Sequence, residues 1–352
     1  MKKILLLASI SLFLIQCKKK VELPELAKDN DYAFFDLKDR VCEINQKITI
    51  LEKSNFTIEE QNATYIFNSF GYLVTDSIYN NENVLIETNT FEKLKFPLTK
   101  KQFISPDNYI LSETLYDSVK NIAHFKKSTP NKQIIEEQRN TLSDDYIVRE
   151  DYFTSGSATP SKVVKIVRNG DVMKSKVILS QTRKILDSIV YVYDKHDIIK
   201  ETHYNANKQI TSTQLFTYEG KNIASVVYLD ASGKEEAVEE FKYNQNNDLT
   251  YKYSFTVSDN STYEEQNVYN KNNKIEKSET KLNGTVLIST TYKYDDKNNI
   301  VSYTVNNFNN KENFSKTFVY TFDEIGNWIS KEVSFNKVPT YKVSRTIKYC
   351  NE

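Results

Sequence analysis

Few residues of this chain stand at spacings that could do chemistry. It has three histidines, His124, His196 and His203, and no two of them stand at metal-ligand spacing with an acidic or cysteine partner. Adjacent acids such as Asp295 and Asp296 lie in a turn sequence, where they form turns more often than glycosidase pairs. The sequence contains no Gly-x-Ser-x-Gly turn and no glycine-rich phosphate loop. It therefore predicts no catalytic residue, no metal site and no cofactor.

Cys17 is the residue whose surroundings indicate a specific modification. Two lysines precede an apolar stretch from Ile4 to Ile15 that is too short to span a bilayer as a stable helix. The run Leu14-Ile15-Gln16-Cys17 then resembles the lipobox of bacterial lipoproteins, although Gln16 departs from the small residue common at that position. The resemblance implies a signal peptide over residues 1–16 and a lipidated Cys17. An ordinary signal peptide with a chance cysteine is the alternative.

The residues after Cys17 bear on location. Lys18 is not the Asp that retains many lipoproteins at an inner membrane, so we expect an outer-membrane lipoprotein. The following basic run stands where some surface-exported Bacteroidota-like lipoproteins carry acids, which leaves the periplasmic and extracellular faces open. Residues 17–31 are polar, contain Pro24 and predict a flexible tether, with a folded domain over residues 32–352.

Composition indicates a folded chain rich in rings. Of 352 residues 12% are aromatic, with 24 Tyr and 19 Phe, which is too many for a disordered protein. Lys and Arg together number 47, as do Asp and Glu, so the net charge is zero. No basic field would attract nucleic acid, and we expect no nucleic-acid partner.

Aromatic pairs recur along the chain, two residues apart and followed by a polar turn. Tyr193, Tyr218 and Tyr243 close successive pairs at intervals of 25 residues. The pairs are Tyr191/Tyr193, Phe216/Tyr218, Phe241/Tyr243, Tyr292/Tyr294 and Tyr320/Phe322. Residues two apart share one face of a strand, and Asp or Asn opens the turn by binding backbone amides. The pattern predicts an all-β, antiparallel meander of repeated hairpins, forming a long curved sheet or an open barrel-like array.

Two of these segments carry a family resemblance. Tyr292-Lys293-Tyr294-Asp295 and the stretch from Tyr320 to Trp328 resemble the YD repeats of RHS proteins, whose core is aromatic-x-aromatic-Asp-x-x-Gly-Asn. The likeness is to the short Bacteroidota type, covers about residues 36–350 and is clearest after Ile189. In large RHS proteins the repeats enclose a toxin. This chain is far shorter, so an open array is favoured over a shell.

Two features concern how the array is divided and closed. Residues 91–189 fit the repeat least well, and the loop from Ser155 to Pro160 marks a possible seam near 155–160. Cys42 and Cys350 lie near the two ends of the folded region. A disulfide between them would require the ends to meet. Two separate thiols on an open sheet are favoured.

The predicted function is a lipid-anchored, non-enzymatic envelope protein whose repeats form a binding or scaffold surface for glycan or protein. Trp328, Tyr294 and Tyr320 are candidate rings for stacking on a ligand, unless they pack against the next repeat. The membrane, through Cys17, and a polysaccharide or another envelope protein are the expected partners. The alternatives are an adaptor or immunity-type partner of an RHS-like toxin and, less favoured, an enzyme that degrades an envelope polymer.

Overall fold

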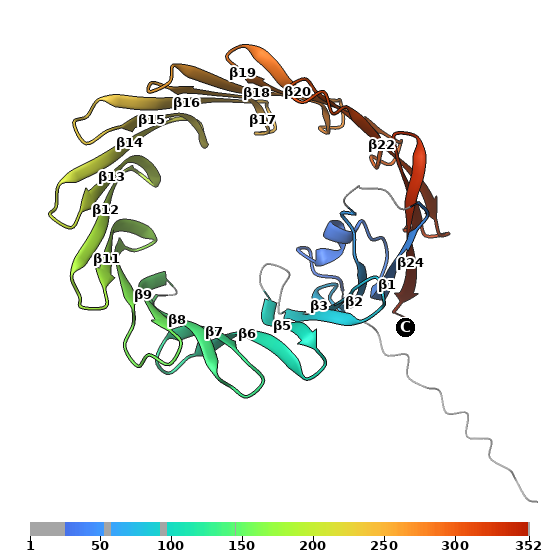
Figure 1. Cartoon of the computed structure of the whole chain (residues 1–352), viewed down its shortest axis with the longest axis horizontal. Helices are drawn as coiled ribbons and strands as arrows, with labels where there is room; N and C mark the ends of the chain where they lie inside the picture. Colours follow the sequence, from blue (N-terminus) through green and yellow to red (C-terminus); the bar gives the residue numbers. More distant parts are fainter. Residues whose placement is uncertain (1–24, 53–57, 92–96, 145, 351–352) are drawn as a thin grey trace, which may run out of the picture.

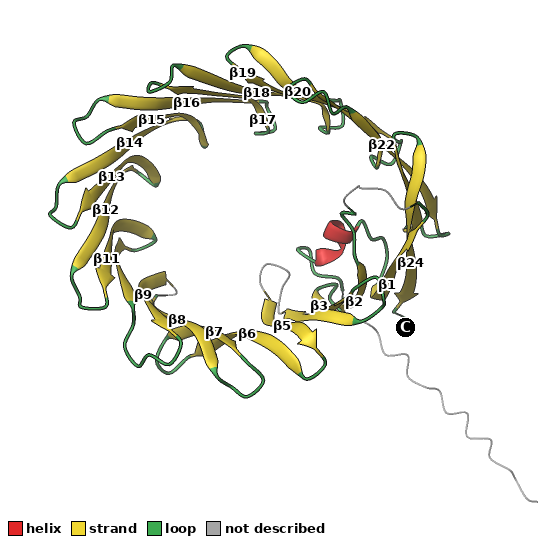
Figure 2. Ribbon diagram, in the orientation of Figure 1, coloured by secondary structure: helices red, strands yellow, loops and turns green. Residues whose placement is uncertain are grey.

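The chain forms a closed ring of antiparallel strands around an open centre (Figures 1 and 2). The computed structural model describes residues 25–52, 58–91, 97–144 and 146–350. Its 24 strands follow one another around the ring in sequence order, each paired with the strands before and after it. The predicted all-β meander of hairpins is therefore confirmed.

One short 3-10 helix, η1 (Asp31–Phe35), precedes the strands. The first twelve strands are β1 (Val41–Ile50), β2 (Asn62–Phe67), β3 (Leu73–Tyr79), β4 (Leu85–Phe91), β5 (Pro97–Ser105), β6 (Asn108–Asp117), β7 (Ile122–Ser128), β8 (Ile134–Ser143), β9 (Tyr146–Thr154), β10 (Lys162–Asn169), β11 (Val172–Ser180) and β12 (Ile185–Asp194). The second twelve are β13 (Asp197–Asn205), β14 (Ile210–Glu219), β15 (Asn222–Leu229), β16 (Glu235–Tyr243), β17 (Leu249–Thr256), β18 (Ser261–Tyr269), β19 (Ile275–Leu282), β20 (Thr285–Tyr294), β21 (Ile300–Asn307), β22 (Phe314–Phe322), β23 (Trp328–Phe335) and β24 (Val338–Tyr349). In the described part of the chain no helix has the length and apolar character to cross a bilayer.

The turns between strands have the geometry that their sequences predict. Asp295 opens the β20–β21 turn, and its Oδ1 accepts hydrogen bonds from the backbone N–H groups of Lys297 and Asn299 at 2.9 and 2.8 Å. Asn298 takes a left-handed conformation with φ 66°, which Asn tolerates better than most residues. The same two bonds recur at the turns opened by Asn80, Asn205, Asp230, Asn244 and Asn270. These six hairpins are thus specified by contacts within about five residues.

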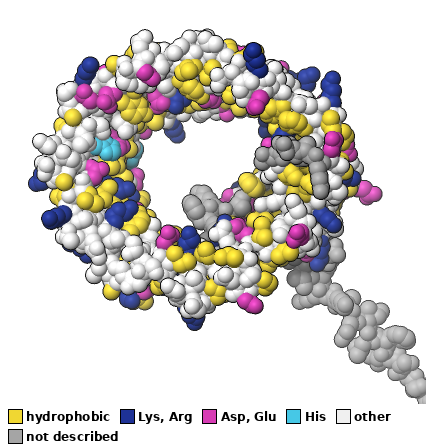
Figure 3. All heavy atoms as spheres, viewed as in Figure 1, with side chains coloured by type: hydrophobic (Ala, Val, Ile, Leu, Met, Phe, Trp, Pro, Cys, Tyr) yellow, Lys and Arg dark blue, Asp and Glu magenta, His cyan; other side chains and the backbone are white. Residues whose placement is uncertain are grey.

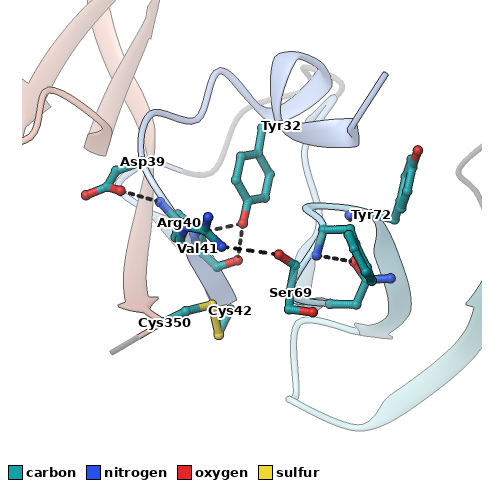
Figure 4. Close-up of a disulfide and its surroundings, with 10 residues drawn as sticks. Tyr32, Asp39, Arg40, Val41, Cys42, Ser69, Tyr72 and Cys350 are labelled. Carbon is teal, nitrogen blue, oxygen red and sulfur yellow. Dashed lines mark hydrogen bonds between the residues drawn. A yellow bond between two sulfur atoms is a disulfide. The ribbon is translucent and has the colours of Figure 1, made fainter. Parts of the chain in front are cut away.

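The ring closes where β1 pairs with β24 as well as with β2. The register between β1 and β24 runs from Val41 opposite Tyr349 to Ile50 opposite Tyr341, with one irregularity. A disulfide between Cys42 and Cys350 joins the same two chain segments (Figure 4). Both findings correct the preference for an open array with two separate thiols. Closure leaves no edge strand, so the backbone groups of β1 and β24 find partners in each other.

The chain before β1 folds back into the ring, and Figure 1 shows η1 on the inner side of β1–β3. Tyr32 and Phe35 of η1 are buried against Ile44, Phe67 and Leu73. The folded part also begins before Tyr32. The Ala27 and Asp31 amides bond to the carbonyls of residues 70 and 71 at 3.0 Å, within the segment expected to be tether. We call residues 25–40 the N-terminal insert.

Two glycine turns lie where the N-terminal insert packs. Gly71 has φ +85°, and a Cβ there would lie 3.0 Å from Asn30 and 3.2 Å from Leu26. Gly326 has φ +95°, and a Cβ there would lie 3.0 Å from Lys38. At many other turns Asn or Lys fills the left-handed position, for example at Asn247 and Lys208. Gly71 therefore needs glycine for space as well as for conformation, whereas at Gly326 the neighbour is the end of a flexible side chain and the conformation favours glycine.

No break divides the ring at the predicted seam. The loop from Ser155 to Pro160 is largely exposed, as expected. However, β9 and β10 pair across it, with Tyr152 opposite Lys162 and Arg149 opposite Lys165. The sheet therefore continues through residues 155–160.

Candidate functional site

The strand register shows which side chains face the centre of the ring. The Tyr65 ring of β2 lies 4.9 Å from the Phe35 ring of η1, centroid to centroid, so that side of β2 faces inward. Directly opposite residues of neighbouring strands share a face. Tyr65 stands opposite Asp76, Asp76 opposite Asn89, and Asn89 opposite Lys100. Continued around all 24 strands, the register divides the wall into an inner face and an outer face.

The aromatic pairs of the repeat lie on the inner face, and two of their second members, Tyr218 and Tyr294, latch adjacent strands together, as does Tyr269, which has Asn267 in place of a first ring. The hydroxyl of Tyr269 donates to the backbone carbonyl of Leu249 at 2.9 Å. Tyr294 donates in the same way to Ile275 at 2.7 Å. Tyr218 bonds to the carbonyl of residue 198 at 2.9 Å. The second tyrosine thus binds the start of the preceding strand, which explains why the pairs recur with a turn after them.

The three rings predicted to stack on a ligand make packing contacts. Trp328 is 6% exposed and lies in a buried cluster with Val333 and Tyr341. Tyr320 contacts the Trp328 ring edge-on at 6.3 Å, and burial raises the pKa of Tyr320 to about 12. Tyr294 is one of the latches. These contacts match the packing alternative, and ligand stacking by these rings stays a prediction.

A cation and a carboxylate hold the interior together near the closure. The Arg345 guanidinium lies 3.4 Å from the centre of the Trp328 ring and donates to the Phe35 carbonyl at 3.0 Å. Burial lowers the pKa of Arg345 to about 10. Glu60, from the β1–β2 connection, bonds to Lys331 and accepts a 2.7 Å hydrogen bond from Tyr341. The interior beside β22–β24 and β1–β3 is therefore filled by structural contacts.

An open groove lies on a different part of the wall, between β5 and β10. It has a volume of about 1010 Å³. Phe125 and Leu98 line it and remain 41% and 39% exposed, and register places Phe125 on the inner face. Figure 3 shows the open centre of the ring. The groove's lining residues are Leu98, Lys100, Ser112, Glu113, Thr114, Phe125, Lys126, Lys127, Glu136, Glu137, Gln138, Tyr152, Phe153, Thr154, Ser161 and Lys162.

Two parallel rows of side chains cross the floor of the groove. The first, which we call the aromatic row, crosses β6–β10 through residues that stand opposite one another: Thr114, Phe125, Gln138, Tyr152 and Lys162. The second, the charged row, lies two residues along each strand: Lys100, Ser112, Lys127, Glu136 and Thr154. Ring faces thus lie beside hydroxyl, amide and charged groups, which is the usual composition of a ligand site.

The groove lysines Lys127 and Lys162 make electrostatic contacts and are at least partly exposed. Lys162 Nζ lies 3.8 Å above the centre of the Tyr152 ring. Burial, with the hydrogen bond and charge of Glu150, raises the pKa of the Tyr152 phenol to about 12, so the phenol stays neutral. Lys127 approaches Glu136 only to 3.7 Å. Such exposed pairs are weak and can exchange for a ligand anion.

The groove lies in the stretch that fits the repeat least well, and sequence reasoning missed it. Its lining segments, such as Gln138-Arg139-Asn140 and Asp151-Tyr152-Phe153, carry no pattern that distinguishes them from an ordinary strand. Strand register brings Phe125 and Tyr152 onto one face although they are 27 positions apart. No local spacing rule could have predicted this.

Residues considered for chemistry stand apart from one another. His196 is exposed, whereas His203 is half-buried and lies 2.6 Å from a Glu201 oxygen. Within the described ranges, no group of three or more metal-ligating side chains occurs. Cys17 and the apolar stretch before it lie outside the described residues, so lipidation stays a prediction.

Comparison with known proteins yields distant likenesses of fold. No protein-family model matches the sequence, and no curated protein does. The TcdB2-TccC3 structure without its hypervariable C-terminal region is 11% identical with a TM-score of 0.28, and the match covers 86% of this chain but 19% of that one. A porin-like protein of Bacteroides uniformis is 10% identical with a TM-score of 0.27, covering 71% and 96%. One of Bacteroides vulgatus is 8% identical with a TM-score of 0.20, covering 89% and 100%.

Proposed function

We propose that this chain is a lipid-anchored protein of the outer membrane, held by Cys17, whose ring binds a glycan or another envelope protein without catalysing a reaction. The inner-wall groove is the binding site. The single observation that carries the proposal is that Phe125 and Leu98 stay exposed inside a concave pocket of about 1010 Å³. Exposed apolar side chains grouped with polar ones in a pocket are the usual mark of a ligand site.

The charges on the outer face of the wall support the proposal that the ring lies in water, attached to the membrane through a tether. Charged residues face outward on several strands, for example Glu264 opposite Lys281 and Glu332 opposite Lys342. A Lys or Arg facing lipid at mid-bilayer would cost about 2–4 kcal/mol. The outer face is thus suited to water, and the lipid predicted on Cys17 would attach the protein to the membrane.

Protease shaving of intact cells tests the location. We expect the native chain to fractionate with the outer membrane and a Cys17→Ala variant to leave the membrane fraction. Cleavage on intact cells would place the ring on the extracellular face, and protection until lysis would place it in the periplasm. A Cys17→Ala variant that stays in the outer-membrane fraction would refute the anchor.

A glycan and protein array tests the binding site with the purified full-length chain in detergent. We expect Phe125→Ala to weaken capture of whichever partner binds, since a buried ring of this size contributes about 1.5–3 kcal/mol. Val319→Ala, on the exposed outer face, is the matched control. A partner that binds both variants as tightly as the native chain would show that the groove is not the site.

A further inference from the structure

We propose that the inner-wall groove binds a linear polysaccharide that carries carboxylates. This inference rests on the proposed function and adds the ligand class. It is carried by the charge of the inner wall, by the spacing of two rings on it and by the closure of the sheet.

The inner face around the groove carries more cations than anions. Five lysines lie on the inner face of β5–β11, four by register and Lys174 by its contact with the inner-face ring of Tyr193 at 5.4 Å, and two glutamates lie on the same face. The lysines are Lys100, Lys127, Lys162, Lys174 and Lys176, and the glutamates are Glu136 and Glu150. Lys100 is paired with Glu87 of β4 at 2.8 Å, and Glu150 accepts a hydrogen bond from Tyr152. The excess of positive charge suits an anionic ligand.

Two rings of the aromatic row are spaced for a repeating ligand. Phe125 and Tyr152 flank Gln138 on β7, β9 and β8, in direct register. Two strand spacings separate the rings by about 9.6 Å. Pyranose units of an extended chain present flat C–H faces that can lie on such rings, while their hydroxyl groups bond to the amide between them. The charged row beside them then meets the carboxylates of the same chain.

Closure of the ring argues against an extended acidic peptide as the occupant. A peptide that binds to a sheet by its backbone needs a free strand edge. Every described strand is paired on both sides, β1 and β24 with each other. The groove therefore offers side chains alone, and its lining is rich in groups that bond to hydroxyls: Ser112, Thr114, Gln138, Thr154 and Ser161.

Calorimetry of the full-length chain in detergent with polygalacturonate oligosaccharides tests the inference. The matched ligand is the same oligosaccharide with its carboxylates methyl-esterified, which keeps the chain and removes the charge. We expect the acidic ligand to bind at least tenfold more tightly than the ester, and its affinity to fall with added salt. Equal binding of the two ligands would overturn the inference.

Paired charge variants locate the site. Lys127→Gln with Lys162→Gln removes two inner cations, and we expect about a tenfold or greater loss of affinity for the acidic ligand. Lys277→Gln with Lys281→Gln removes the same charge from the outer face and should change affinity less than twofold. An equal loss in both double variants would refute a groove site.

The ligand panel separates the failure of this inference from failure of the proposed function. Binding of a neutral glycan or an acidic peptide that Phe125→Ala abolishes, without binding of polygalacturonate, would keep the groove as a binding site and reject the acidic polysaccharide. Failure of every ligand to respond to Phe125→Ala would reject both. Circular dichroism of each variant, matched to the native chain, shows that the loss is not one of folding.

Discussion

Loss of the Cys42–Cys350 disulfide should lower stability without opening the ring. The bond joins residues 308 positions apart. The chain-entropy relation then gives a stabilisation of up to about 6 kcal/mol, because the unfolded chain loses the freedom of a very long loop. For a folded part of this length that corresponds to a Tm lower by about 8 °C. Scanning calorimetry of Cys42→Ser, Cys350→Ser and the double variant measures the change.

The single and double variants provide the internal control. Each single substitution already breaks the bond, and both cysteines are partly buried, so the double variant should cost no more than about 0.5 kcal/mol beyond either single. The pairing of β1 with β24 remains in all of them, and limited proteolysis below Tm should give the native pattern. For a folded part of this length, about 1 kcal/mol of unfolding free energy corresponds to a Tm shift of about 2 °C. A variant whose Tm lies within about 2 °C of the native value would therefore refute the entropic reasoning. Native-state opening of the ring would refute the role assigned to strand pairing.

Three further outcomes are expected. Tyr269→Phe removes one latch and should lower the free energy of unfolding, measured in urea, by about 0.5–1.5 kcal/mol. An unchanged free energy of unfolding would show that the latch does not stabilise the fold. Burial alone would raise the pKa of Glu60, but hydrogen bonds from Lys331 and from a tyrosine bring it below its ordinary value. This carboxylate therefore stabilises the fold above about pH 5, and its contribution is lost as pH falls through the lowered pKa. Fluorescence of Trp328, the sole tryptophan, should follow that loss, and a Glu60→Gln variant should show a smaller change between pH 6 and 3. Arg345→Met should lower the free energy of unfolding by about 2–4 kcal/mol, because it removes the hydrogen bond to the Phe35 carbonyl and uncovers the Trp328 ring. A fall in Tm with unchanged Trp328 fluorescence emission would contradict the stacking of Arg345 on Trp328.

Hairpins were predictable because each depends on neighbours in sequence. Asp295 and Asn298 illustrate this, since one side chain binds two amides within the turn and the other tolerates the left-handed conformation. Because residues two apart in a strand share a face, the sequence also predicts that both rings of a pair lie on one side of the sheet. It does not predict whether that side faces the centre of the ring. The latch from Tyr294 to the preceding strand was hidden, because it joins residues 19 positions apart across a turn.

Gly326 and Asn327 show where a sequence pattern had a tertiary cause. The Gly-Asn of the YD-like pattern is retained at the β22–β23 turn and replaced at most others. In the structure Asn327 is fully buried, and its side chain bonds to the backbone of Lys38 and to the Tyr349 hydroxyl. The motif is therefore kept at the turn where the N-terminal insert meets β24. Its function is to join distant segments, which no local spacing reveals.

The closure of the ring, the packed interior beside β22–β24 and β1–β3, and the groove depend on all the strands together. Hydrophobic periodicity and turn chemistry specify a hairpin, because their hydrogen bonds form within a few residues. Whether the ends meet depends on the twist and curvature accumulated over 24 strands, and the preference for an open sheet was wrong for that reason. Phe125 and Tyr152 likewise became neighbours in one row through the register of three strands. Local sequence thus determines the hairpin, whereas the ring and its groove depend on long-range strand pairing.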